Sequence, residues 1–160
     1  PGVGHFKKAI SNLTQLNLVE TLHENVIIKK KHTLGICLGM QLMAKNSEEG
    51  NVKGLGWIDA NVLKFKVSDN LKFKIPHIGW NQINVEKESK LMKNISNGNE
   101  FYFVHSFYMK SNKNEEILNT TEYENTFTSA IEKENIFGVQ YHPEKSLDIG
   151  QTLLKNFIDL

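Results

Sequence analysis

One short stretch around the only cysteine constrains this chain more than any other. Cys37 stands at the centre of a Gly-x-Cys-x-Gly pentad over residues 35–39. Residues 32–36 are typical of the end of a buried strand, and residues 38–44 of the first turns of an apolar helix. The pentad has the form of the Gly-x-Ser-x-Gly nucleophile elbow, with sulfur in place of oxygen. We expect both of its glycines to be required, because a side chain beside the strained nucleophile would collide with the turn.

The predicted elbow gives the cysteine a chemical advantage. The helix that follows would point its N-terminal N–H groups at the sulfur, which favours the thiolate over the thiol. The same geometry would offer the N–H of Leu38 to a developing oxyanion. A buried structural cysteine is the simple alternative, since free cysteines are among the most buried residues. The flanking glycines, and a histidine later in the chain, favour a nucleophile.

That histidine is His142, which directly follows the apolar segment 137–141 and would emerge at a strand end. Glu144 lies two residues further on, and in extended backbone such residues project to the same side. Pro143 keeps the segment extended and supplies no competing N–H. The carboxylate can therefore hold one imidazole nitrogen while the other faces Cys37, as in a nucleophile, base and orienting-acid triad.

Composition excludes several other classes of function. The formal net charge of +1 gives no reason to expect binding to nucleic acid or to a charged membrane surface. A single cysteine allows no internal disulfide, which fits a reducing compartment, and we expect a cytoplasmic protein. No Cys or His pair has metal-ligand spacing, so we expect no metal and no cofactor. The length of 160 residues fits one domain, 1–160.

Hydrophobic periodicity predicts helices at both ends of the chain and strands between them, which indicates an α/β layered domain. The last helix should bury Leu147, Leu153, Leu154, Phe157 and Ile158. The expected helices cover 6–16, 18–29, 38–46 and 147–160. The expected strands cover 33–37, 60–67, 71–75, 83–85, 100–110, 126–132 and 136–141. Residues 76–81, 119–124 and 142–146 are expected to form loops.

Residues 35–41, together with His142, Pro143 and Glu144, resemble the class I (triad) glutamine amidotransferases. Six further segments narrow the resemblance to the glutaminase subunits of imidazole glycerol phosphate synthases, and the match runs from end to end. These segments are 1–4, 47–50, 54–56, 76–81, 104–106 and 138–146.

The resemblance implies that Cys37 attacks the side-chain amide of glutamine, that His142 transfers the protons and that Glu144 orients His142. It also implies that ammonia passes to a (β/α)₈ cyclase subunit, in a heterodimer that makes imidazole glycerol phosphate and aminoimidazole carboxamide ribotide for histidine biosynthesis. The oxyanion hole would be formed by the N–H groups of Val3 and Leu38. Glutamine would be bound by Gly4, Gln41, Glu49, His105, Ser106 and Phe107. The implied partner interface comprises Trp80, Tyr102 and Lys145.

The resemblance further implies a mixed, largely parallel central sheet flanked by helices, plus a small antiparallel sheet. Members of the family carry roughly one more pair of βα units before the position of Pro1. The chain also begins on a glycine-rich turn without methionine. We therefore expect an N-terminally truncated domain that, with an open sheet edge, is inactive by itself.

Three other interpretations are compatible with parts of the sequence. A paralogous glutaminase that supplies ammonia to amidate a surface-polysaccharide sugar would have the same motifs. A binding module that has lost catalysis is disfavoured, because Cys37, His142 and Glu144 are all present. A papain-like protease also pairs Cys with His, but it would leave the pentad and the His-x-Glu pair unexplained.

Overall fold

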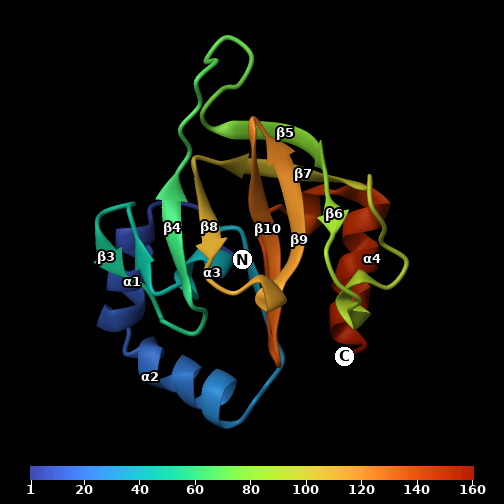
Figure 1. Ribbon diagram of the computed structural model, residues 1–160. Helices are drawn as coiled ribbons and strands as arrows, with labels where there is room; N and C mark the ends of the chain where they lie inside the picture. Colours follow the sequence, from blue (N-terminus) through green and yellow to red (C-terminus); the bar gives the residue numbers. More distant parts are fainter.

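The computed structural model describes residues 1–160 and arranges them as strands flanked by helices (Figure 1). The strands are β1 Thr33–Ile36, β2 Asn46–Ser47, β3 Val52–Lys53, β4 Ala60–Lys64, β5 His77–Gln82, β6 Asn84–Val85, β7 Glu100–His105, β8 Phe107–Ser111, β9 Ile117–Tyr123, β10 Asn125–Lys133 and β11 Ile136–Val139. The α-helices are α1 Phe6–Gln15, α2 Leu18–His23, α3 Leu38–Leu42 and α4 Leu147–Ile158. A π-helical turn, η1, covers Glu24–Ile28, and 3₁₀ turns cover η2 Lys90–Met92, η3 Asn114–Glu116 and η4 Pro143–Lys145. No helix combines the length and the apolar character that a membrane crossing requires.

The strands form a mixed sheet of nine strands and a separate ribbon of two. The order in the large sheet is β1-β11-β10-β8-β4-β2-β3, with β9 paired to β10 and β6 paired to β9. Its parallel pairs are β1–β11 and β2–β4, so only part of the sheet is parallel. The antiparallel ribbon of β5 and β7 crosses one end of the large sheet (Figure 1). This arrangement confirms the predicted α/β class with a mixed central sheet and a small antiparallel sheet. The expectation of a largely parallel sheet is wrong, because most strand pairs of the large sheet are antiparallel.

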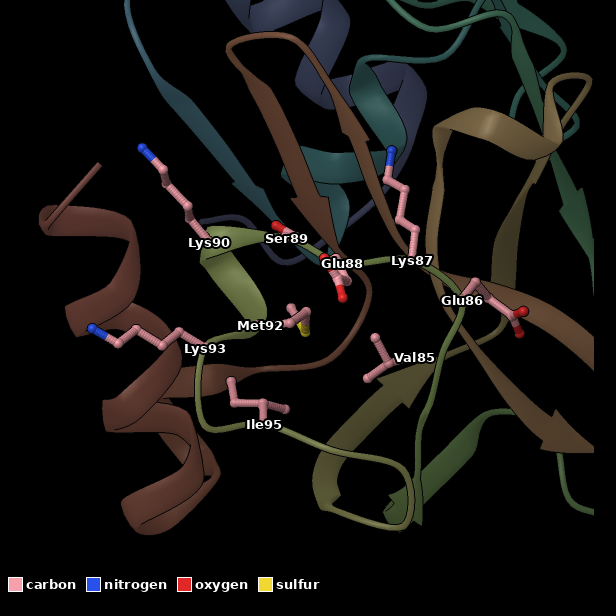
Figure 2. Close-up of a pocket in the computed structure, with 9 residues that line it drawn as sticks. All are labelled: Val85, Glu86, Lys87, Glu88, Ser89, Lys90, Met92, Lys93 and Ile95. Atoms are coloured by element: carbon pink, nitrogen blue, oxygen red, sulfur yellow. The ribbon is translucent and has the colours of Figure 1, made fainter.

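The segment around η2 lies against α4 and lines an open groove of about 920 Å³ (Figure 2). The buried amide of Asn156 anchors the segment by donating hydrogen bonds to the carbonyls of Leu91 and Lys93, at 2.9 and 2.7 Å. The groove has no cysteine or histidine in its lining, so it lacks the chemistry that the sequence places around Cys37. Its lining consists of Val85, Glu86, Lys87, Glu88, Ser89, Lys90, Met92, Lys93 and Ile95.

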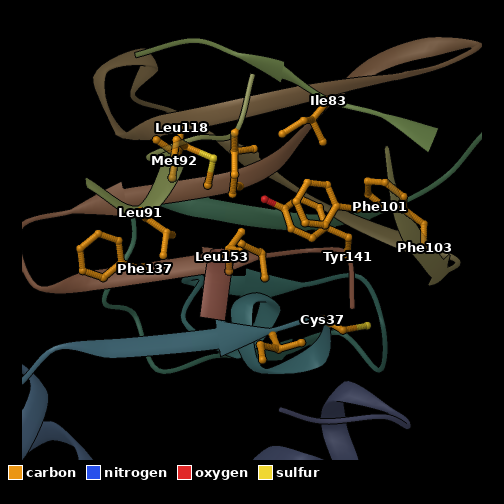
Figure 3. Close-up of a cluster of buried hydrophobic side chains, with 14 of the residues drawn as sticks. Cys37, Ile83, Leu91, Met92, Phe101, Phe103, Leu118, Phe137, Tyr141 and Leu153 are labelled. Atoms are coloured by element: carbon orange, nitrogen blue, oxygen red, sulfur yellow. The ribbon is translucent and has the colours of Figure 1, made fainter. Parts of the chain in front are cut away.

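The large sheet separates two hydrophobic cores. Successive residues of β10 point to opposite faces, so Ala130 belongs to one core and Ile131 to the other. Apolar side chains of α1 and α3 pack in the core of Ile131, whereas Leu153 of α4 packs in the core of Ala130. Figure 3 shows the core to which Ala130 belongs, in which Tyr141 stacks on Phe101 with ring centroids 4.1 Å apart.

Two neighbouring glycines allow α3 to lie directly on the sheet. Gly35 of β1 and Gly138 of β11 are register partners. A Cβ at Gly35 would lie 2.7 Å from backbone atoms of Gly39 and Met40, and a Cβ at Gly138 would lie 2.7 Å from Cγ of Met40. The expectation for the other glycine of the pentad is wrong, because a Cβ at Gly39 would meet only the nitrogen of Pro1, at 3.9 Å.

The predicted helices 6–16 and 18–29 and the predicted strands 33–37 and 126–132 are confirmed. Strand β3, at one edge of the sheet, was not predicted, and three inner segments were predicted wrongly. Residues 71–75 form turns rather than a strand, and Leu71 is 86% exposed. Residues 76–81, expected as a loop, are mostly strand β5, because they pair along the whole length of β7. Most of the segment 119–124, also expected as a loop, belongs to β9, which ends at Tyr123 and pairs with β10.

The polar composition of β9 led to the wrong prediction of a loop, because its polar side chains are buried and form hydrogen bonds with groups inside the protein. Asn119 is completely buried, and its amide donates to the Tyr141 hydroxyl and accepts from Ser129. Thr121 donates to the same Ser129 hydroxyl at 2.8 Å. In α4, the prediction of buried Leu147 and Ile158 is wrong, since both are largely exposed at the ends of the helix.

Candidate active site

Cys37 lies at the turn between β1 and α3, in a backbone conformation that residues other than glycine rarely adopt. Its φ of 52° and ψ of −111° are unusual for a residue other than glycine and indicate local strain. The turn is held from both sides: the Cys37 N–H donates to the Val139 carbonyl at 2.8 Å, and α3 begins at the next residue. The strand–turn–helix context predicted for the pentad is therefore present.

The thiol of Cys37 is buried and has two polar neighbours. The side-chain nitrogen of Gln140 donates to Sγ at 3.6 Å, and Sγ lies 4.0 Å from the carbonyl oxygen of Val104. Burial raises the pKa of the Cys37 thiol to about 11, although the Leu38 N–H and the Gln140 amide lower it. The thiol is thus protonated at neutral pH in this structure, and a base has to remove its proton.

His142 and Glu144, predicted as the base and its orienting acid, lie in hydrogen-bond contact. Nδ1 of His142 lies 2.6 Å from Oε1 of Glu144, while the imidazole is 2% exposed and Nε2 has no hydrogen-bond partner. Because a carboxylate accepts, Nδ1 carries the proton and Nε2 presents a lone pair. This is the tautomer that a general base requires.

Strand order brings His142 to the same sheet edge as Cys37. β1 and β11 are adjacent and parallel, and Ile36 is the register partner of Val139, so both chains leave the sheet in the same direction. No hydrogen bond joins the two side chains, however, since the sulfur faces the Val104 carbonyl and Nε2 of His142 has no partner. A rotation about the Cα–Cβ bond of Cys37 moves the sulfur without moving either strand.

A pocket of about 270 Å³ opens beside Cys37. All residues that the sequence assigned to the oxyanion hole and to substrate binding line it. These are Val3, Leu38, Gly4, Gln41, Glu49, His105, Ser106 and Phe107. Pro76 and Val104 complete the lining.

Several pocket residues also make contacts within the protein. The Leu38 N–H donates to the Gly2 carbonyl, but at 3.4 Å this hydrogen bond is long and weak. Oε2 of Glu49 accepts the first N–H of α1, that of Phe6, at 2.7 Å. The amide nitrogen of Gln41 donates to the Phe107 carbonyl and to Oε1 of Gln140, both at 2.9 Å, so only Oε1 of Gln41 remains for a ligand.

Gln140 was missed as a site residue, although it makes the hydrogen bond to the Cys37 sulfur. The signal was present in the sequence, because a glutamine two residues before His142 interrupts an otherwise apolar strand. A completely buried amide needs partners for its donors and its acceptor.

The three residues predicted at a partner interface lie together on the ribbon side of the molecule. Trp80 and Tyr102 are register partners in β5 and β7, with ring centroids 6.1 Å apart. Nζ of Lys145 lies 5.9 Å from the centroid of the Tyr102 ring. Trp80 is 46% exposed and its neighbour Ile78 is 58% exposed, so this face presents accessible apolar surface.

Comparison with known proteins agrees with this geometry. The family model described as glutamine amidotransferase class-I matches residues 1–160, and the chain belongs to this family of enzymes. The family predicted from the motifs is thereby confirmed.

The relatives are more specific than the family. The chain is 51% identical over 158 residues to "Imidazole glycerol phosphate synthase subunit HisH 2" of Methanococcus maripaludis, covering 99% of this chain and 77% of the relative. It is 47% identical over 161 residues to "Imidazole glycerol phosphate synthase subunit HisH 1" of Campylobacter jejuni, covering 100% and 79%. A solved glutamine amidotransferase from Thermotoga maritima shares the fold, with a TM-score of 0.65 at 18% identity, covering 99% of this chain and 60% of that one.

Proposed function

We propose that the chain is the glutaminase subunit of an imidazole glycerol phosphate synthase and uses Cys37, His142 and Glu144 to hydrolyse glutamine. The observation that carries this proposal is the His142–Glu144 pair, with its free Nε2, at the sheet edge where Cys37 forms the elbow. The names of the relatives favour this enzyme over the amidation of a polysaccharide sugar.

The reaction begins when Nε2 of His142 takes the proton of the Cys37 thiol. The thiolate attacks the side-chain carbonyl carbon of glutamine. The resulting imidazolium protonates the amide nitrogen, and the C–N bond breaks to release ammonia and leave a γ-glutamyl thioester. His142 then removes a proton from water, which attacks the thioester carbonyl carbon. The C–S bond breaks, glutamate is released, and the imidazolium returns the proton to the Cys37 sulfur. Glu144 accepts the Nδ1 proton of His142 in a hydrogen bond throughout and stabilises the imidazolium.

The tetrahedral oxyanion would be held by the N–H groups of Leu38 and Val3. The Leu38 N–H already lies near the sulfur, and its weak bond to the Gly2 carbonyl can be replaced by a bond to a charged oxygen. Glutamine would occupy the adjacent pocket, with the Glu49 carboxylate and the Ser106 main chain on its walls.

Ammonia would pass to a cyclase subunit bound in a heterodimer at the face of Trp80, Tyr102 and Lys145. Exposed aromatic groups beside a cation are typical of the centre of a protein interface. We treat residues 1–160 as one amidotransferase domain, in which the ribbon of β5 and β7 carries most of this face.

The test measures glutamate release by the chain in complex with its cyclase subunit. Replacing the nucleophile (Cys37→Ala) and the base (His142→Asn) should each abolish glutamate release, whereas the change of an exposed histidine (His23→Asn) should leave it unchanged. Glutamate release that persists in Cys37→Ala would refute the proposed nucleophile. Mass spectrometry of His142→Asn with glutamine tests whether the thioester depends on the base.

A further inference from the structure

Two buried histidines outside the proposed triad face each other across the ribbon. His77 of β5 and His105 of β7 are register partners, and each is less than 10% exposed. The ring of His77 lies between those of Tyr123 and Phe103, with centroids 4.0 and 5.0 Å away. Neither imidazole has a carboxylate partner among its hydrogen bonds, so neither resembles the base of the triad.

The direction of the hydrogen bonds between these rings is set at one end by the main chain. The Phe107 carbonyl lies 2.7 Å from Nδ1 of His105 and can only accept, so Nδ1 carries the proton. Nε2 of a neutral His105 must then accept from Nδ1 of His77, which is 3.1 Å away. Nε2 of His77 is then unprotonated and lies 3.3 Å from the amide nitrogen of Asn81.

The other end fixes the same direction independently. The amide of Asn81 cannot be reversed, because its oxygen accepts from the Gln82 N–H and its nitrogen donates to the Glu122 carbonyl, both at 2.8 Å. Its second amide proton therefore points at Nε2 of His77. Protonation of either ring would bring two donors face to face. Burial lowers the pKa of His77 to about 4 and that of His105 to about 3. The nearby His77 and His142 lower the pKa of His105 as well, whereas its hydrogen bond to the Phe107 carbonyl raises it.

The same series of bonds continues from Phe107 to the nucleophile. The Phe107 carbonyl also accepts from the amide nitrogen of Gln41, at 2.9 Å. The second proton on that nitrogen goes to Oε1 of Gln140, so the amide nitrogen of Gln140 is turned toward the Cys37 sulfur. A reversed Gln140 amide would present oxygen to the sulfur and would disfavour the thiolate.

We propose that this continuous hydrogen-bond chain, from Asn81 through His77, His105, the Phe107 carbonyl and Gln41 to Gln140, positions the Gln140 amide as a donor to the Cys37 sulfur. The inference rests on the proposed role of Cys37 as the nucleophile. The imidazoles of His77 and His105 are accordingly positioning groups, which act on the thiolate through the other members of the chain, whereas Gln140 donates to the sulfur itself.

The test measures how fast iodoacetamide alkylates Cys37 between pH 6 and 10, which requires neither glutamine nor the cyclase. Removing the donor (Gln140→Met) should slow alkylation at pH 8 roughly threefold, because a smaller fraction of Cys37 is then thiolate. The loss is limited to this factor because a thiolate with a higher pKa is also more nucleophilic. The change His77→Phe keeps the aromatic stack but breaks the chain, and it should slow alkylation in the same direction by a smaller factor.

The matched control is Tyr123→Phe, which keeps the ring over His77 but removes the two hydrogen bonds between its hydroxyl and the main chain of Lys74. This control should alkylate like the unchanged protein. If His77→Phe behaves like Tyr123→Phe, or if Gln140→Met leaves the rate unchanged, the proposed chain is refuted. Loss of glutaminase activity cannot produce either result, so this failure is distinct from failure of the proposed function.

A second measurement uses the unchanged protein and does not depend on whether variants fold. Long-range ¹H–¹⁵N spectra of the imidazole rings at pH 7 should show both His77 and His105 neutral and protonated on Nδ1. A proton on Nε2 of either ring, or an imidazolium, would overturn the proposal, because the chain has no acceptor in those positions.

Discussion

Two alanine substitutions in the same pentad should have opposite effects on stability. At Gly35 the new methyl group would lie 2.7 Å from the carbonyl carbon and oxygen of Gly39 and from the nitrogen of Met40. These are backbone atoms of α3, which cannot rotate away as a side chain could. Gly39 lies within α3, where a methyl group would meet nothing closer than 3.9 Å.

The expected magnitudes follow from these contacts. Overpacking at Gly35 should cost about 1 to 3 kcal/mol, reduced by up to about 1 kcal/mol because alanine restricts the unfolded chain. Gly39→Ala should stabilise the protein by up to about 1 kcal/mol, since alanine is the better helix former. For a chain of 160 residues, the two variants should differ in melting temperature by roughly 4 to 10 °C.

The assay is thermal and urea unfolding of both variants, followed by glutamate release in the complex with the cyclase subunit. Gly35→Ala should also lose about tenfold or more of the activity, because α3 carries the Leu38 N–H and moves with the clash. Gly39→Ala should keep the activity. If Gly39→Ala destabilises the protein as much as Gly35→Ala, the argument from close backbone contact is wrong.

Three further predictions concern the triad, the groove and the buried histidines. Glu144→Gln should lower glutamate release by a factor on the order of 10³, because the base loses its orienting carboxylate; an unchanged rate would exclude that role. Asn156→Ala should lower the free energy of unfolding by about 2 kcal/mol in urea, since two carbonyls lose their donor, while glutaminase activity is kept. Acidification should also destabilise the protein. His77 and His105 bind protons near pH 6.5 when unfolded but only near pH 4 and 3 when folded. Between these values the unfolded chain holds more protons, so the free energy of unfolding should fall by up to about 2.7 kcal/mol per pH unit as the pH drops. His77→Phe should reduce that slope by half, and an equal slope would contradict the assignment.

The local features around the site could be predicted from the sequence because each depends on residues that lie close together along the chain. The elbow needs a strand, a turn and a helix over about ten residues, and the pair His142 and Glu144 needs only extended backbone between them. The structure contains both the elbow and the pair. The predicted pocket residues also came together, through motifs whose order along the chain indicated the family.

Pairing between distant segments was harder to predict. Residues 76–81 became a strand because β7, which begins about twenty residues further along the chain, offers a full row of backbone partners. β9 could bury Asn119 only because the Tyr141 hydroxyl, beyond the end of β11, accepts from its amide and Ser129 of β10 donates to it. From the sequence alone, a polar residue predicts an exposed loop, because the buried group that would satisfy its hydrogen bonds is not known.

The sequence by itself determined the class of enzyme and pointed to the residues that we propose as nucleophile and base, because strand ends and short motifs are local properties. Only the tertiary structure decided that Gly35 is indispensable for packing while Gly39 is not, and that the Cys37 thiol faces Val104 and Gln140 rather than His142. These outcomes depend on which atoms of distant segments meet in three dimensions, and close packing leaves each of them little freedom to differ.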